Sequence, residues 1–174
     1  MSRTILPPSV STRADPITLL FNLFKTDLQI VADDGTTLLT PENYIILEKA
    51  PYAQEGAGEK PQVIVGPRKP PIRRPISLPP IWYEIDDPVR VRIITRNWDG
   101  GDFGFTLDGS AARYKVITSI VSILNANFTN PDGTGTWTWI RPMDNGTDSD
   151  ENPEGTHLYR TDITIGCRRY SQID

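Results

Sequence analysis

Two stretches of the chain place apolar residues three and four positions apart, the spacing that buries one side of a helix. The first begins at Asp15-Pro16, where Asp can cap the free backbone N–H groups, and it ends at Asp33-Asp34-Gly35. The second is capped by Ser110 and runs to about Asn127. Each predicted helix has an apolar stripe, so each needs an apolar surface elsewhere in the chain to cover.

Alternating apolar and polar residues, together with short β-rich runs, predict the strands of a sheet. The predicted strands are residues 44–47, 62–65, 82–96, 136–141 and about 157–169. The first two fit a hairpin, and Pro88 marks a bulge or an edge position because it cannot donate to a ladder. Since most consecutive strands can pair antiparallel, we expect an α+β fold: a mostly antiparallel sheet with two amphipathic helices packed on one face.

We expect a single α+β domain over residues 15–174, preceded by a flexible N-terminal arm over residues 1–14. Two long connections interrupt the predicted sheet: a basic, Pro-rich arm over residues 67–80 and an acidic loop over residues 142–156. Proline fixes the φ angle, so the Pro-rich arm should be extended and semi-rigid, with a reach of roughly 40 Å. It is a passive loop, a ligand for a Pro-recognition module, or a segment that docks on a neighbouring subunit or a polyanion.

The first helix carries a second apolar strip beside its main stripe. Leu19, Leu23 and Ile30 form this strip, which makes the apolar surface wider than one small sheet usually needs. One interpretation is a deeply buried helix. The other is that the strip packs on a second subunit, because an apolar strip left in water would be unusual on a soluble monomer.

Composition and charge narrow the classes of function. The chain has 18 Lys and Arg against 22 Asp and Glu, a formal charge of −4, so it has no overall attraction for nucleic acid, although a local basic patch is possible. Cys167 is the only cysteine, so no intrachain disulfide can form, which fits a reducing compartment. We expect no signal peptide and no contact with a membrane, because no segment approaches the roughly 20 apolar residues of a membrane span.

Residues that could carry chemistry are few and poorly placed for it. His157 is the only histidine, and Cys167 is in phase with the apolar residues of the last strand, so it should be an inert core thiol. Residues 148–154 place oxygen ligands at alternate positions, as calcium loops do, but the central glycine and the closing glutamate are missing. The glycine-rich loop 97–109 lacks the lysine and hydroxyl of a phosphate-binding loop. We therefore expect no enzyme, no cofactor and no metal.

The order of these elements resembles the tail terminator and tail-completion proteins of tailed phages and tailed archaeal viruses. The resemblance spans most of residues 15–170: an amphipathic helix, a VIV strand, a long interruption, a VRVRIIT strand, a helix containing RYKVITSIVSIL, and a closing YRTDITIGCRR strand. Such proteins are α+β domains that assemble as rings, commonly hexamers, cap the tail tube and join it to the neck. The resemblance implies a virion structural protein assembled in the host cytoplasm, whose partners are itself, the tail tube protein and neck or connector proteins.

The resemblance also implies which segments make contacts between subunits or with the tube and neck. The Pro-rich arm supplies the cations, and the 97–109 loop supplies the aromatic residues; the expected contact residues are Arg68, Lys69, Arg73, Arg74, Trp98 and Phe103, together with the helical strip Leu19, Leu23 and Ile30. The arm would cross onto the next subunit or line a lumen that carries DNA, with nonspecific, salt-sensitive phosphate contacts. Oppositely charged loops on one protomer suit head-to-tail contacts in a closed ring. The alternatives are a head–tail connector of the same neck, and a non-viral adaptor that binds proteins through its Pro-rich arm.

Overall fold

The computed structural model describes residues 15–50, 60–76, 82–98, 106–144, 146–151 and 158–172. Within these residues the chain forms two helices and a mostly antiparallel sheet, which confirms the predicted α+β fold. The elements in chain order are α1 (Pro16–Asp27), β1 (Ile30–Val31), β2 (Leu38–Leu39), β3 (Ile46–Lys49), β4 (Gln62–Arg68), β5 (Ile72–Pro75), β6 (Trp82–Arg96), α2 (Gly109–Ala126), β7 (Trp139–Pro142), β8 (Thr147–Glu151) and β9 (Leu158–Gln172).

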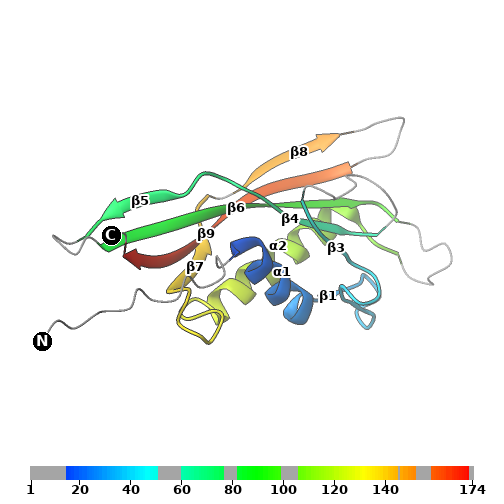
Figure 1. The fold of residues 1–174 in the computed structure, drawn as a ribbon. Helices are drawn as coiled ribbons and strands as arrows, with labels where there is room; N and C mark the ends of the chain where they lie inside the picture. Colours follow the sequence, from blue (N-terminus) through cyan, green and yellow to red (C-terminus); the bar gives the residue numbers. More distant parts are fainter. Residues whose placement is uncertain are drawn as a thin grey trace, which may run out of the picture.

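The main sheet is built around two long antiparallel strands, β6 and β9, each of 15 residues. They pair in continuous register from Trp82 opposite Gln172 to Arg96 opposite Leu158. At about 3.3 Å per residue, each strand is roughly 50 Å long. On the far side of β6 lie β5 and β4, with β3 beyond β4; on the far side of β9 lie β7 and β8 (Figure 1).

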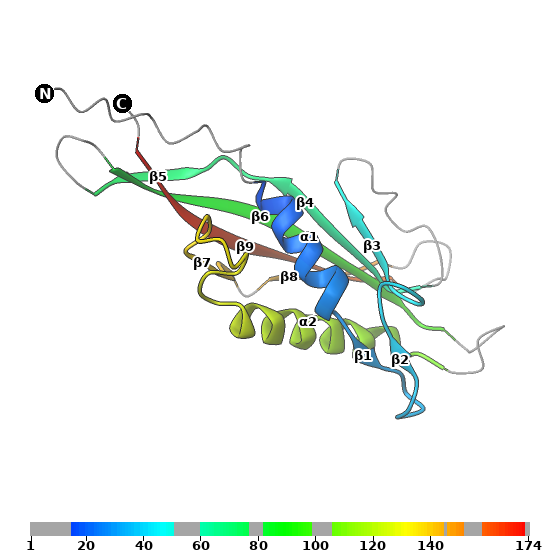
Figure 2. The same cartoon turned by 60° about the horizontal axis from the view of Figure 1, so that its bottom comes forward.

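Both helices lie on the same face of the sheet, here called the helix face (Figures 1 and 2). α1 packs on β3 and β4, and α2 packs on β6 and β9. Successive strand residues point to opposite faces, so the odd-numbered residues of β6 and β9 enter the core and the even-numbered ones lie on the other side, the reverse face. Neither helix of the described residues is long and apolar enough to cross a lipid bilayer.

The first helix is shorter than the sequence predicted. It starts as expected, with the Asp15 carboxylate accepting hydrogen bonds from the backbone of Ile17 and Thr18, but it ends at Asp27. Leu28 is already extended, and Ile30–Val31 form β1, which pairs with β2. The reason is local: β-branched residues lose side-chain freedom in a helix and fit a pleated strand better.

The predicted hairpin between the first two strands of the main sheet is wrong. β3 pairs with β4 in parallel, with Ile46 opposite Gln62 and Lys49 opposite Val65. The segment between them, residues 50–61, is about a dozen residues long, which is enough for the crossover that a parallel pair requires. Of that segment, residues 51–59 lie outside the described part of the chain.

Over residues 67–76 the Pro-rich segment is extended, as predicted, but much of it pairs with the sheet of its own protomer and is not a free arm. β4 continues to Arg68, and after a short turn Ile72–Pro75 form β5, antiparallel to the first part of β6. The backbone of β6 supplies the hydrogen-bonding partners that water would supply to a free arm. Residues 77–80 of the predicted arm lie outside the described residues.

A bulge near Pro88 was predicted correctly. The register between β4 and β6 shifts between Val65 and Arg68, next to the position where β4 leaves β6 and β5 takes its place. Gly66 lies inside this irregularity with a φ angle of 112°, a conformation that L side chains rarely adopt. The missing donor of Pro88 therefore falls where the neighbouring ladder is interrupted.

Three boundaries in the second half of the chain also differ from the prediction. Asp108, not Ser110, caps α2, and its carboxylate accepts from the backbone of Ser110 and Ala111. β7 begins at Trp139. The acidic segment is not a loop throughout, because residues 147–151 form β8, antiparallel to β9. Residues 145 and 152–156 of the predicted loop lie outside the described part.

Candidate subunit-contact surface

Three of the four arm cations are held inside the protomer. Arg68 pairs with the Asp87 carboxylate, and Lys69 Nζ donates to Thr164 Oγ1 at 2.9 Å. Arg74 Nη1 lies 3.1 Å from Glu84 Oε1 and 3.3 Å from Asp86 Oδ2. These cations therefore fix the Pro-rich segment to its own sheet, and carboxylates compensate the charges of Arg68 and Arg74 there.

Arg73 is the exception among the four. It lies in β5, where every residue is exposed, and it makes no hydrogen bond or ion pair with the residues that the structure describes. Arg73 is opposite Ile85, a core residue, so its side chain is on the helix face of the sheet. Of the three predicted arginines, Arg73 is thus the one whose charge is not compensated by a described carboxylate.

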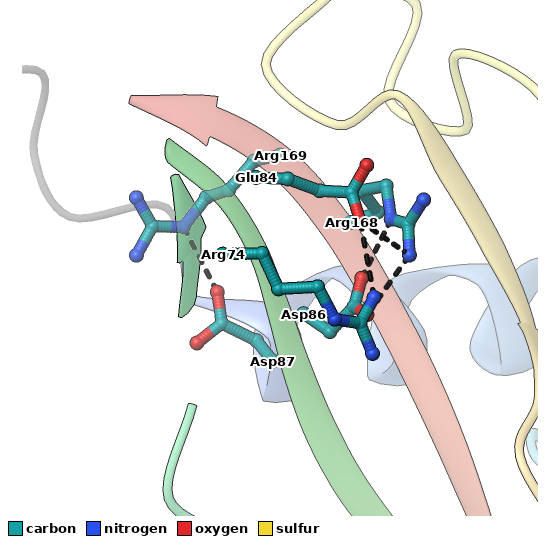
Figure 3. A network of polar contacts seen from close by, with 6 residues as sticks. All are labelled: Arg74, Glu84, Asp86, Asp87, Arg168 and Arg169. Atoms are coloured by element: carbon teal, nitrogen blue, oxygen red, sulfur yellow. Dashed lines mark hydrogen bonds and ion pairs between the residues drawn. The ribbon is translucent and has the colours of Figure 1, made fainter. Parts of the chain in front are cut away.

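An ion network on the reverse face clamps β5 and β9 to β6 (Figure 3). Arg168 binds Asp86 with two nearly parallel contacts, Nε to Oδ1 at 2.7 Å and Nη2 to Oδ2 at 2.9 Å, and also lies 2.9 Å from Glu84. Arg74 reaches the same two carboxylates from β5. Asp86 is only 2% exposed, so its charge depends on these guanidinium groups for solvation.

A second ion cluster lies on the helix face, one residue further along β6. Asp87 is completely buried, and it accepts from Arg169 Nε at 2.8 Å and from Arg68. Figure 3 shows Arg169 meeting Asp87 on the other side of the strand from the Arg168 group. The Pro-rich segment is therefore tied to the sheet on both faces, through Arg68 on the helix face and Arg74 on the reverse face.

The sequence held a signal for these clusters that the prediction missed. β6 carries Glu84, Asp86 and Asp87, while the closing strand carries Arg168 and Arg169. In two adjacent antiparallel strands, opposite charges at facing positions are expected to pair. The cations of the Pro-rich segment then find carboxylates within their own chain, before any neighbouring subunit.

Large apolar side chains are exposed around the reverse-face network. Ile72, Ile76, Trp82 and Tyr170 are 41–54% exposed. Their register places them on the reverse face, because Ile72 lies opposite Asp86 and Tyr170 lies opposite Glu84. We call these four residues the β5-end patch. Aromatic and aliphatic side chains beside arginines are the composition that protein-binding surfaces favour.

The remaining predicted contact residues are distributed differently. Leu19 and Leu23 are half-buried and pack against the core of their own protomer. Ile30 lies in β1, not in α1, and it is 4% exposed; Trp98 is 5% exposed. These two residues therefore have little surface left for a partner. Phe103 lies outside the described residues.

The prediction that Cys167 faces the core is confirmed. Its side chain is completely buried, and burial raises the pKa of its thiol well above the usual value. Among the described residues no three His, Cys, Asp or Glu side chains form a group that could hold a metal ion. Two members of the calcium-like pattern lie in β8, where Asp148 accepts from Thr161 Oγ1 and Asp150 pairs with Arg113. His157 lies outside the described residues.

A separate arginine cluster surrounds Asp162 on the reverse face. Arg92 Nε and Nη2 donate to its two carboxylate oxygens at 2.7 and 3.0 Å, and Arg160 and Arg90 lie 3.5 and 4.0 Å away. Burial of Asp162 opposes its ionisation. The hydrogen bond and charge of Arg92, with the charges of Arg160 and Arg90, outweigh burial and hold the pKa of Asp162 below its usual value.

We expect acid to weaken the fold in part through Asp162. Because its folded-state pKa is depressed, its ion pairs stabilise the fold above the unfolded-state pKa of about 3.9 and lose that effect as pH falls through the folded-state pKa. Asp162→Asn should lower the free energy of unfolding at neutral pH by about 1–2 kcal/mol. As pH falls, the free energy of unfolding of this variant should also decrease less steeply than that of the wild type. Urea unfolding across this pH range measures both effects. Parallel curves of unfolding free energy against pH for the two proteins would contradict the role given to Asp162.

No model of a known protein family matches the chain, and no curated protein sequence matches it.

Proposed function

We propose that this chain is a structural protein of a tailed virus, a tail terminator that assembles as a ring on the end of the tail tube and joins the tube to the neck. The β5-end patch is the observation that carries the proposal. It holds four exposed apolar or aromatic side chains on a sheet that ion pairs fix from both faces. A rigid, partly apolar surface of this kind suits a lasting contact between proteins.

The charge arrangement favours a protein partner over DNA. A surface that binds phosphates needs cations whose charge is not already matched. Arg68 and Arg74 are paired with carboxylates, and Lys69 is hydrogen-bonded to Thr164. Because only Arg73 and Lys69 lack a carboxylate partner among the described residues, we propose that the Pro-rich segment contacts a neighbouring protein, and that DNA in a lumen is at most a weak, nonspecific contact.

The shape of the protomer suits a ring as well. β6 and β9 run together over roughly 50 Å, with edge strands at each end. A protomer of this length can present different surfaces to the two neighbours on either side, as a closed head-to-tail ring requires. The head–tail connector of the same neck would use the same surfaces. The adaptor alternative has less support, because β5 holds part of the Pro-rich segment as a paired strand and not as a free proline helix.

The test is the assembly state of the purified protein and the effect of the β5-end patch on it. Mass photometry and negative-stain electron microscopy should find a discrete ring whose mass is a small multiple of 19.5 kDa. Replacing Trp82 and Tyr170 together with alanine should weaken assembly about tenfold, while the fold is retained because both side chains are exposed. Val121→Ala, at an exposed apolar position on α2, is the control and should assemble normally. A wild-type protein that stays monomeric at every concentration would contradict the proposed function.

A further inference from the structure

We infer that neighbouring copies join head to tail through two edge strands, with β5 of one copy docking beside β8 of the next. The inference deepens the proposed function and rests on it in one respect, namely that copies of the chain assemble with each other. The two strands are the surfaces that meet, and their charged residues determine which strand each one pairs with.

The two strands occupy diagonally opposite corners of the sheet. β5 pairs with residues 83–86 of β6, and β8 pairs with residues 158–162 of β9. Residues 158–162 of β9, which pair with β8, lie opposite residues 92–96 of β6. The two edge strands are therefore offset by roughly 30 Å along the sheet. Figure 1 shows them at opposite ends of the long strand pair. One copy can therefore offer β5 to one neighbour and β8 to the other without obstruction between the two contacts.

The two strands carry opposite charge and are exposed. β5 has the sequence IRRP, and all four residues are exposed. β8 has the sequence TDSDE, and residues 147–150 are exposed. Arg73 has no partner among the described residues, and the Asp150 side chain remains 63% exposed although it pairs with Arg113. Free positive charge on one edge thus matches accessible negative charge on the other.

The charged side chains also lie on the same face. Arg73 is on the helix face, as shown above, and Asp148 and Asp150 are opposite Thr161 and Tyr159, in phase with the core residues of β9. In a rotationally symmetric ring the helix faces of all copies have the same orientation relative to the axis. Placing β5 beside β8 then brings Arg73 to the side of the neighbour that carries Asp148 and Asp150.

The charges select this pairing over the symmetric ones. Two β5 strands would place arginines against arginines, and two β8 strands would place carboxylates against carboxylates, so like charges oppose both isologous contacts. The heterologous contact is the one in which the charges of the two edge strands attract each other. Edge strands with this pattern therefore favour a head-to-tail chain of copies over a twofold dimer.

The backbone of β5 limits how the contact is made. Ile76 N donates to Trp82 O, and hydrogen-bonded pairs alternate along an antiparallel ladder, so the backbone of Arg73 and Pro75 faces the outer edge. Pro75 has no N–H to donate, which prevents a continuous ladder of hydrogen bonds to another strand. The contact must then depend mainly on side-chain ion pairs, and it should weaken at high salt.

Charge reversal on each edge, followed by mixing, tests the inference. Arg73→Glu and Asp148→Lys should each weaken self-association at least about tenfold, because each places like charges at the contact. Mixed in equal amounts, the two variants should form alternating assemblies of wild-type size, since both of their contacts are then between opposite charges. Circular dichroism of each variant alone shows whether it is folded, and recovery on mixing excludes misfolding as the cause.

Matched reversals away from both edges are the controls. Lys25→Glu and Asp27→Lys change the net charge by the same amounts at exposed positions of α1 and should assemble as the wild type does. If the wild type assembles and Arg73→Glu and Asp148→Lys assemble equally well, the strand pairing is wrong while the proposed ring stands. Association that is lost in both variants and does not return on mixing also overturns the pairing. A wild type that never assembles overturns the ring and the pairing together.

Discussion

Asp87→Ala is expected to lose about 3 kcal/mol of its free energy of unfolding, because a buried carboxylate with two guanidinium partners disappears. The remaining cations would lie beside a cavity with no compensating charge. Arg68 and Arg169 are 32% and 24% exposed, so water can reach them in part, and the loss should be at the lower end of the range for broken buried ion pairs. Urea unfolding at neutral pH measures the change.

The same substitution should release the Pro-rich segment from the sheet. Trypsin cleaves after Arg and Lys unless proline follows, so the Arg68–Lys69 and Arg73–Arg74 bonds are the susceptible ones in this segment. Both should be cut faster in Asp87→Ala than in the wild type. Asp87→Asn keeps the volume of the side chain and one hydrogen-bond acceptor. Its rate of cleavage should lie between those of the wild type and Asp87→Ala. A loss below about 1 kcal/mol, with unchanged cleavage, would mean that the Asp87 cluster does not hold the segment.

Gly109→Ala is expected to cost about 3 kcal/mol or more, since the added methyl group has no space. A Cβ atom at Gly109 would lie 2.4 Å from the carbonyl carbon of Arg96 and 2.7 Å from the backbone nitrogen of Asn97. Both are backbone atoms at the end of β6, so α2 would have to move away from the sheet. That movement would also break the hydrogen bonds that Gly109 makes with Asn97 Oδ1 and with the Thr95 hydroxyl.

Gly133→Ala is the matched control for this prediction. Nothing lies within 4 Å of a Cβ atom there. Placing alanine at the φ angle of 66° should lower the free energy of unfolding by only about 1–2 kcal/mol. Thermal unfolding followed by circular dichroism compares the two variants with the wild type. Equal shifts in the two midpoints would show that contact between α2 and the end of β6 is not what limits stability.

Sequence patterns predicted the parts of the fold that have a buried side. α2, β6 and β9 each place apolar residues at a constant period because one side of each packs in the core. β5 and β8 were missed for the opposite reason. Their described residues are exposed, and they are strands because the edges of β6 and β9 supply hydrogen-bonding partners. Such a strand has no hydrophobic periodicity, and the prolines in and before β5 indicate a non-strand segment.

The residue types of the candidate site were predictable from the sequence, but the pairs that these residues form were not. The sequence identified the cations of the Pro-rich segment as a group, and their role in subunit contacts stays a prediction. Which of them are available to a partner depends on register: Arg74 lies opposite Glu84, and Arg168 lies opposite Asp86. A shift of one residue would turn each side chain to the other face, so these pairs follow only from the paired strands.

Cys167 offers a built-in chemical reporter on this sheet. It is the only thiol in the chain, and it is buried opposite Asp87 in the middle of the β6–β9 pair. Because the thiolate is the reactive form and the side chain lies in the core, an alkylating reagent should modify Cys167 only in molecules whose packing over the helix face of the sheet has opened. The rate of alkylation therefore reports the opening of this part of the core without any engineered label.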